Sequence, residues 1–204
     1  MTTAAAIVSG GRASRLGGVA KGTLMIGGRR IVDRQLEVLR PLFSRVVIIA
    51  NDPGPWSGLG LTILADRLRD AGPLAGLEAA VSTLSSGEEA IVCVAGDMPF
   101  LSPAAVTLLR DHAPGAVAVA ARLGGRPEPL FGRYGRQCAG PIARALAEGR
   151  LQAGAFLHMV GALWLDEGAL RKVDPALATF ENVNSPDDLE RAETWVASGR
   201  NETL

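Results

Sequence analysis

Residues 5–21 read AAIVSGGRASRLGGVAK, a short apolar run that leads directly into a glycine-rich loop. Residues 5–9 have the length and composition of a buried strand, and the first pair of glycines ends it. The four glycines let the backbone turn tightly and come close to a ligand, and exposed N–H groups in such loops bind phosphate oxygens. Arg15 and Lys21 add positive charge beside those groups. The stretch therefore predicts a strand followed by a phosphate-binding loop.

A flexible surface loop without a ligand is the alternative interpretation, since glycine-rich patterns alone are weak evidence of a site. The loop also differs from two well-known phosphate-binding patterns. No Gly-Lys-Ser/Thr follows at the spacing of a P-loop, and residues 9–21 contain no GxGxxG dinucleotide fingerprint. A phosphate-binding loop at this position would belong to neither of those two classes.

Apolar strands and segments of helical period alternate along the rest of the chain. The strand candidates are short apolar runs at 45–50, 61–65, 90–95, 116–121 and 128–134. Helices are predicted at 31–43, 74–84, 140–148 and 153–160, and after the cap signals Ser102-Pro103 and Ser185-Pro186. This alternation predicts an α/β fold, a three-layer Rossmann-like domain with a mostly parallel sheet. We expect one domain over 1–204, with its core at about 4–197.

Composition excludes several classes of protein. The 204 residues suit one large α/β domain, and Lys+Arg and Asp+Glu both number 21, so general phosphate neutralisation on nucleic acid is not expected. The N-terminus lacks a positively charged region and its apolar run stops at Ser9, so neither a signal peptide nor a membrane span is expected. Cys93 and Cys138 stand in no metal-binding spacing. We therefore expect a cytoplasmic protein that binds neither nucleic acid nor membranes.

Asp97 follows the entirely apolar run at 90–95, separated from it by Gly96. Ligands of open α/β sheets bind beyond the carboxyl ends of the strands, and Mg²⁺ takes one or two carboxylates together with phosphate oxygens and waters. Asp97 is therefore our candidate metal ligand. The alternative is an Asp that caps the following turn. The glycine-rich loop and its two cations, expected at the same edge of the sheet, favour the metal.

Two further polar residues follow predicted strands. Asn51 comes directly after the strand at 45–50, and Asp66 comes after the strand at 61–65. Asn51 is placed to hydrogen-bond a base edge, and Asp66 to accept from a ribose hydroxyl or a guanine N–H. For each residue taken singly an ordinary turn is favoured, because Asn and Asp are common in turns.

Five segments, taken together, resemble the nucleotidyltransferases that act on the molybdenum cofactor, and the molybdenum cofactor guanylyltransferases in particular. They lie at 10–21, 66–76, 96–100, 126–130 and 180–189, in the order that the family has them. The last of them reads FENVNSPDDL and is similar to the family's closing Asn-Val-Asn-Thr-Pro-Glu. The resemblance runs from Ala5 to about Ala192, and it implies the nucleotidyltransferase version of the fold.

The resemblance also implies roles for individual residues. Ser9, Gly10 and Gly11 would hold the base and phosphates, Lys21 would contact phosphate, Asp97 would hold Mg²⁺, and Asn182 and Asn184 would lie near the metal or the acceptor. The pair Gly10-Gly11 is similar to the guanine-using members, whereas cytosine-using relatives tend to have Ala-Gly. Three positions depart from the family pattern: Ala20 replaces the usual Asp, Ser9 the usual Ala, and Gly96 the common Cys.

The reaction so implied is transfer of GMP from GTP to the terminal phosphate of molybdopterin, with or without molybdenum, and release of pyrophosphate. Arg15, Lys21 and Asp97 are the expected catalytic residues. A loose basic run, Arg122, Arg126, Arg133 and Arg136, is either a solvated face or the site of the acceptor's phosphate. The alternatives are a cytidylyltransferase for the same cofactor, a sugar-phosphate nucleotidyltransferase, and a non-catalytic GTP-binding regulator. Other cofactor-biosynthesis proteins or molybdoenzyme chaperones are expected as partners.

Overall fold

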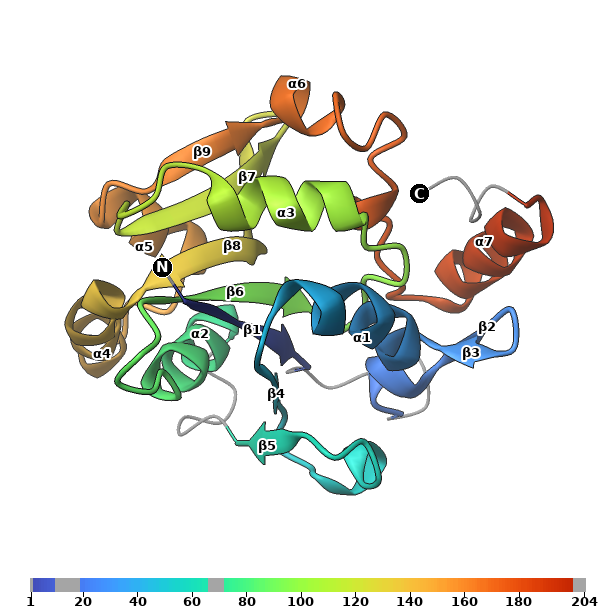
Figure 1. Cartoon of the computed structure of the whole chain (residues 1–204), viewed down its shortest axis with the longest axis horizontal. Helices are drawn as coiled ribbons and strands as arrows, with labels where there is room; N and C mark the ends of the chain where they lie inside the picture. Colours follow the sequence, from blue (N-terminus) through green and yellow to red (C-terminus); the bar gives the residue numbers. More distant parts are fainter. Residues whose placement is uncertain (1, 10–18, 66–71, 200–204) are drawn as a thin grey trace.

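The computed structural model describes residues 2–9, 19–65 and 72–199, and these residues form a three-layer α/β structure (Figure 1). Its centre is a seven-stranded sheet in the order β5-β4-β1-β6-β8-β7-β9. The strands are β1 (Thr3–Val8), β4 (Val46–Ile49), β5 (Thr62–Leu64), β6 (Ala90–Ala95), β7 (Ala118–Leu123), β8 (Arg126–Gly135) and β9 (Leu163–Asp166). The strand β6 thus lies in the middle of the sheet, as its apolar sequence predicts.

All strands of the sheet except β8 run in the same direction. The pairs β1–β4, β1–β6, β4–β5 and β7–β9 are parallel, whereas β8 is antiparallel to both of its neighbours. The mostly parallel sheet expected from the sequence is therefore confirmed. The carboxyl ends of six strands and the amino end of β8 consequently meet at one edge, which we call the carboxyl edge; the opposite edge is the amino edge.

Helices cover both faces of the sheet. The longer ones are α1 (Ile31–Leu42), α2 (Pro73–Ser82), α3 (Pro103–Asp111), α4 (Ala139–Ala147), α5 (Ala153–Met159) and α7 (Pro186–Ala197). Buried residues of α2, α4 and α5 share one apolar cluster with the sheet, and those of α1 and α3 share the other. Short helical pieces lie at Lys21–Thr23 (η2), Gly54–Trp56 (η3), Arg136–Cys138 (η4), Glu167–Leu170 (α6) and Ala178–Phe180 (η5). No helix within the described ranges is long and apolar enough to cross a membrane.

Most predicted elements agree with the structure to within two residues, and three strands are additional. The strand β9 was not predicted because it has only four residues, one of which is the exposed Leu163, and is the outermost strand of the sheet. The hairpin of β2 (Met25–Ile26) and β3 (Arg29–Arg30) is two residues long on each side. It turns through Gly27 and Gly28, both at positive φ. Patterns this short carry no periodicity that could be read.

The helix α7 packs against this hairpin through a small third cluster. Its members include Ile26, Phe100, Val183 and Ala192. The predicted cap of α7 is confirmed: Ser185 accepts from the amide of Asp188, and the Asp188 carboxylate accepts from that of Ser185. The cap thereby fixes the backbone where α7 begins.

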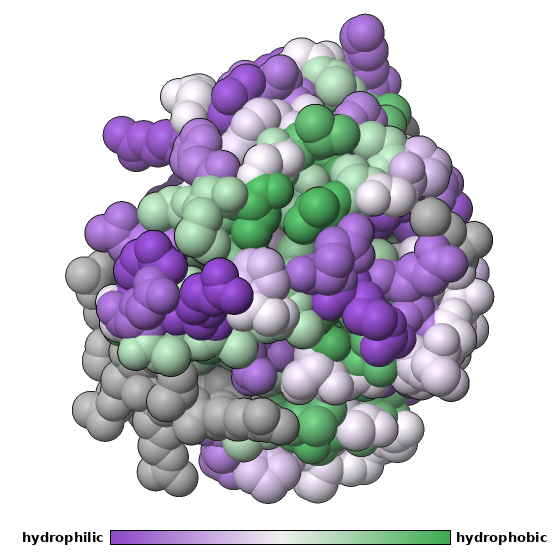
Figure 2. Space-filling view, turned by 90° about the vertical axis from the view of Figure 1, so that its left-hand side faces the viewer, coloured by the Kyte–Doolittle hydropathy of each residue, from purple (hydrophilic) through white to green (hydrophobic). Residues whose placement is uncertain are grey.

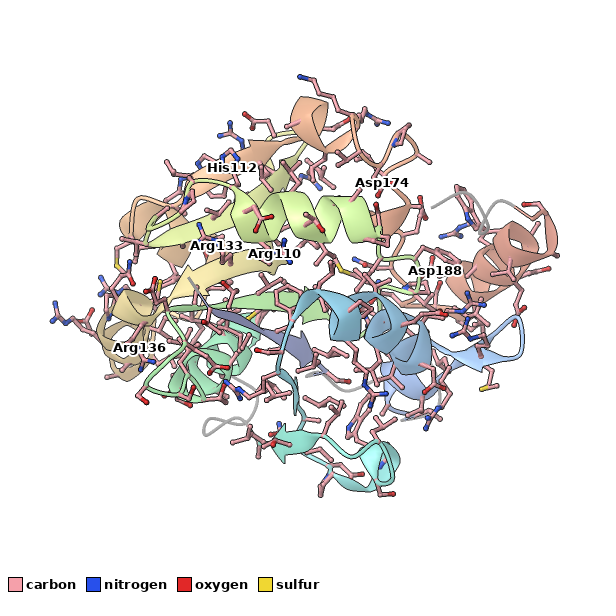
Figure 3. The ribbon with its side chains drawn as sticks, viewed as in Figure 1. Arg110, His112, Arg133, Arg136, Asp174 and Asp188 are labelled. Carbon is pink, nitrogen blue, oxygen red and sulfur yellow. The ribbon has the colours of Figure 1, made fainter. Side chains whose placement is uncertain are left out.

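The amino edge is closed by charged side chains that satisfy one another. The Arg45 guanidinium binds both carboxylate oxygens of Glu88, at 2.7 and 2.5 Å, and the amide of Ser85 donates to the same carboxylate at 2.9 Å. Arg136, labelled in Figure 3, donates to the carbonyls of Leu84, Ser85 and Glu88. The hydrogen bonds from Arg45 lower the pKa of the buried Glu88 to about 2. These contacts join the loops that enter β4 and β6 to the end of β8.

The face that carries α4 and α5 presents apolar surface between hydrophilic residues (Figure 2). A hollow of about 400 Å³ lies between these two helices, lined among others by Ala145, Leu151, Phe156 and Met159. Neither this hollow nor the adjoining one of about 390 Å³ is lined by Lys21 or Asp97. Both hollows therefore lie away from the polar residues that the sequence places at the carboxyl edge.

Candidate active site

Lys21, Asp97 and Asn184 meet at the carboxyl edge, although they are far apart in the sequence. The Lys21 ammonium lies 3.0 Å from Asp97 Oδ2 and also donates to Asn184 Oδ1. The Lys21 and Asp97 side chains are 25% and 17% exposed, so solvent and a ligand can reach both. The structure thus brings together a residue of the glycine-rich loop, the candidate metal ligand and one of the two asparagines.

The position of Asp97 follows from its strand. Because β6 is apolar on both faces and buried throughout, it has to lie centrally, and the turn that follows it emerges in the middle of the carboxyl edge. The Asp97 carbonyl accepts from the amide of Val183 at 2.9 Å. That bond ties the Asn182–Asn184 stretch to the turn. Asp97 therefore contacts two distant segments, Lys21 through its carboxylate and Val183 through its backbone carbonyl.

Three backbone segments approach closely beneath this group. A Cβ atom on Gly22 would lie 2.7 Å from the Trp56 ring and 3.2 Å from the Gly96 carbonyl oxygen. A Cβ on Gly96 would lie 3.0 Å from Ser9 Cβ and 3.1 Å from Ser9 Oγ. Real Cβ atoms are rarely this close to a neighbour, so both glycines are needed for the approach. Two of the departures from the family pattern, Ser9 and Gly96, are thus in direct contact.

Asn184 is oriented by the helix that follows it. Its backbone amide donates to Asp188 Oδ2 at 2.9 Å, and the amide of Ser185 donates to the same atom at 2.8 Å. These backbone donors, the Asn184 amide first, lower the pKa of Asp188. Asp188 is labelled in Figure 3, at the start of α7. The sequence predicts a helix start at Ser185-Pro186, but not the contact of Asp188 with the asparagine before it.

The remaining predicted site residues within the described ranges are Asn182 and Asn51. Asn182 Oδ1 is buried and has no hydrogen-bond partner within the described ranges. Asn51 follows β4 at the carboxyl edge, where it is exposed. Gly10, Gly11, Arg15 and Asp66 lie outside the residues that the structure describes.

The basic run at 122–136 is not a cluster. Arg122 pairs with Asp166 and lies over the Trp164 ring. Arg133 is buried and donates to the carbonyls of His112 and Ala113, at the end of α3 (Figure 3). Arg136 lies at the amino edge. The idea that the four arginines together hold one phosphate is therefore wrong, because Arg122, Arg133 and Arg136 bind different parts of the fold.

The residues present suit Mg²⁺ only if a ligand supplies oxygens. No group of three or more His, Cys, Asp or Glu side chains in the described ranges could form a complete protein cage. Asp97 Oδ2 accepts from Lys21, whereas Oδ1 has no such contact among these residues. The Asp97 carboxylate, the buried amide oxygen of Asn182 beside Val183, and the Lys21 ammonium are groups of the kind that hold Mg²⁺ together with a nucleotide. The donor set therefore fits a magnesium–nucleotide complex.

Comparisons with known proteins identify chains that are related to this one. The model of the MobA-like NTP transferase domain matches residues 5–160. The molybdenum cofactor guanylyltransferase of Desulfosudis oleivorans is 33% identical to the chain over 95% of it and 96% of that protein. That of Cereibacter sphaeroides is 35% identical over 92% of the chain and 94% of that protein.

A solved structure shows the same similarity. Molybdopterin-guanine dinucleotide biosynthesis protein A from Archaeoglobus fulgidus superposes with a TM-score of 0.81 at 28% identity. The match covers 96% of this chain and 99% of that one. Family model, full-length relatives and fold all agree, and the chain therefore belongs to the MobA-like NTP transferases and, within them, to the molybdenum cofactor guanylyltransferase family.

Proposed function

We propose that the chain transfers GMP from GTP to the terminal phosphate of molybdopterin, with or without bound molybdenum. An oxygen of that phosphate would bond to the α-phosphorus of GTP, and the bond from the α-phosphorus to the bridging oxygen would break. Pyrophosphate would leave with the electron pair. The observation that carries the proposal is the Lys21–Asp97–Asn184 group at the carboxyl edge. The chain that contains this group is related to a guanylyltransferase over 95% of its length.

Catalysis in this proposal rests on positioning and charge stabilisation, because the acceptor phosphate is already an anion and needs no protein nucleophile. Asp97 would hold Mg²⁺, whose charge, when it is bound, offsets that of the phosphates. Lys21 has three N–H donors and uses two of them on Asp97 and Asn184. The third would donate to a phosphate oxygen of the leaving group, and Arg15 would act with it.

The remaining site residues receive their roles by position. Ser9, Gly10 and Gly11 would hold the base and phosphates, Asn51 a base edge, and Asp66 a ribose hydroxyl or guanine N–H. Asn182 and Asn184 would contact the metal or the acceptor; that Asn182 Oδ1 has no partner among the described residues supports this. We propose that 1–204 act as one domain, in the cytoplasm. Other cofactor-biosynthesis proteins or molybdoenzyme chaperones would receive the product.

Pyrophosphate release with each nucleotide tests the proposal. The protein would be incubated with molybdopterin, Mg²⁺ and GTP, CTP or ATP, and pyrophosphate measured alongside the melting temperature. We expect release with GTP, and a larger rise in melting temperature with GTP than with CTP or ATP, because a ligand that binds only the folded state stabilises it.

The other outcomes separate the alternatives. Preference for CTP would indicate the cytidylyltransferase, and release only with a sugar phosphate as acceptor would indicate a sugar-phosphate enzyme. A rise in melting temperature with GTP but no pyrophosphate with any acceptor would indicate a GTP-binding regulator. Each of these three results would refute the proposed reaction.

A further inference from the structure

Gln35 is a polar residue at a buried position of α1. Its side chain is fully inaccessible to solvent. The amide nitrogen Nε2 donates to two carbonyl oxygens, that of Ala95 at 2.7 Å and that of Met98 at 3.0 Å. These two carbonyls stand on either side of Gly96-Asp97. One side chain of a neighbouring helix therefore bridges the turn that carries the candidate metal ligand.

The other half of the Gln35 amide is left unsatisfied. Its Oε1 is buried and has no hydrogen-bond partner among the described residues. Burying such a group costs free energy, and the adjacent positions Leu36 and Leu39 show that this part of α1 accepts apolar side chains. The two hydrogen bonds to the turn are the compensating interaction that the structure shows.

The turn depends on contacts from outside itself. Its own backbone hydrogen bond, from the Met98 amide to the Ala95 carbonyl, is long, at 3.4 Å. The Asp97 carbonyl is bound by the Val183 amide at 2.9 Å. Gln35 thus binds the carbonyls of Ala95 and Met98, and Val183 binds that of Asp97. The Asp97 side chain extends from the segment between the two carbonyls that Gln35 binds.

We propose that Gln35 is a positioning residue, which sets the location of the Asp97 carboxylate relative to Lys21 through the turn 95–98. This inference rests on the proposed function, since it takes Asp97 to be the metal ligand. Groups that orient a metal ligand without touching the metal commonly affect metal affinity by about 10–100-fold. Gln35 would therefore influence the reaction although it contacts neither substrate.

The test compares Gln35→Met with Leu39→Ala. Met has similar length and suits a helix, but it cannot donate to the two carbonyls. Leu39→Ala destabilises the same helix one turn further on and removes no hydrogen bond. We expect Gln35→Met to raise the Mg²⁺ concentration for half-maximal pyrophosphate release by about tenfold. Leu39→Ala should lower the melting temperature and leave this concentration unchanged.

Gln35→Glu supplies a second variant, isosteric with the wild type. At this fully buried position, against two carbonyl oxygens, a Glu side chain would stay protonated and could donate to only one of them, so this variant should shift the Mg²⁺ dependence less than Gln35→Met does. Wild-type Mg²⁺ dependence in Gln35→Met would overturn the proposal. An equal shift in Leu39→Ala would overturn it too, because loss of stability alone would then explain the effect.

Nucleotide binding separates this inference from the proposed function. GTP affinity would be measured by calorimetry with and without Mg²⁺ on the same proteins. If the wild type releases no pyrophosphate, the proposed reaction fails. The role of Gln35 then stands if Gln35→Met weakens only the Mg²⁺-dependent part of GTP binding, and it fails if both parts change equally or not at all.

Discussion

The two edges of the sheet use charged residues in opposite ways. At the amino edge, Arg45, Glu88 and Arg136 bind one another and the surrounding carbonyls, and the Glu88 side chain is only 6% exposed. At the carboxyl edge, Lys21 and Asp97 pair while remaining accessible, and oxygens of Asn182 and Asp97 lack partners among the described residues. At the amino edge the charged side chains satisfy one another, whereas at the carboxyl edge oxygen atoms of the described residues are left that could bind a ligand.

This difference separates stability from chemistry. A buried, fully bonded charge that loses its partner leaves an uncompensated charge behind, so such groups matter to folding. A partly exposed pair contributes less to stability, because solvent competes for both charges. Substitutions at the amino edge should therefore alter unfolding and spare turnover, and those at the carboxyl edge should do the reverse.

The largest effect is expected for Asp97→Asn. This variant keeps the shape and much of the hydrogen bonding but removes the negative charge that would hold Mg²⁺, so we expect transfer to fall about 10³-fold or more. Mg²⁺ affinity should fall with it, while metal-free GTP binding survives in part. Pyrophosphate release measured against Mg²⁺ concentration checks this. An Asn variant with unchanged rate and metal dependence would show that Asp97 only shapes its turn, since Asn and Asp are comparable caps.

Lys21→Ala should lower the rate by roughly 10²–10³, by analogy with the removal of one donor to a developing negative charge. The free energy of unfolding should change by no more than about 1 kcal/mol, because the ion pair with Asp97 is partly exposed. Single-turnover rates and urea unfolding of the same preparation measure both quantities. Near-normal turnover would remove the glycine-rich loop from the active site.

Glu88→Gln probes the opposite edge. The lowered pKa of Glu88, about 2 against an ordinary 4.5, corresponds to at most about 3 kcal/mol of stability. Solvent at Arg45, which is 31% exposed, reduces this somewhat. We expect urea unfolding at neutral pH to show a loss of about 2–3 kcal/mol, with kcat unchanged below the melting temperature. A large loss of kcat without a loss of stability would contradict the division between the two edges.

The same pair of proteins should respond differently to acid. The pKa of Glu88 is lower in the folded state, so its stabilisation is fully present above about pH 4.5 and is lost as the pH falls towards 2. The difference in unfolding free energy between wild type and Glu88→Gln should therefore be constant near neutrality and shrink over that acid range. Other acidic groups are common to both proteins and cancel in the difference. A gap that widens in acid would refute the assignment to Glu88.

The sequence predicts the sheet well because its strands are defined by local composition. The run at 90–95 matches β6 residue for residue, and the apolar spacing of 31–43 matches the buried face of α1. The site is harder to predict, since its contacts join residues that only the tertiary fold brings together, as in Lys21–Asn184. Gln35 did leave a signal: it is a polar residue three positions after Val32, on the apolar face of the predicted helix. What the sequence could not reveal was which carbonyls that amide would bind.

The smallest effect concerns the two family departures that meet at the carboxyl edge, Ser9 and Gly96. Gly96→Cys would bring a new Cβ to 3.0 Å from Ser9 Cβ and 3.1 Å from its Oγ, so the variant should be overpacked and lose about 1–3 kcal/mol. Ser9→Ala removes the Oγ contact and restores the family's usual Ala, so the double variant Ser9→Ala/Gly96→Cys should recover about 1 kcal/mol of that loss. Recovery is partial because the close approach of the two Cβ atoms remains. A double-mutant cycle on the free energy of unfolding measures the coupling. If the two single effects simply add, the departures at Ser9 and Gly96 are independent substitutions. A coupling of the expected sign would mean that the larger Ser9 and the smaller Gly96 form one compensated change, which leaves the packing beneath Asp97 intact.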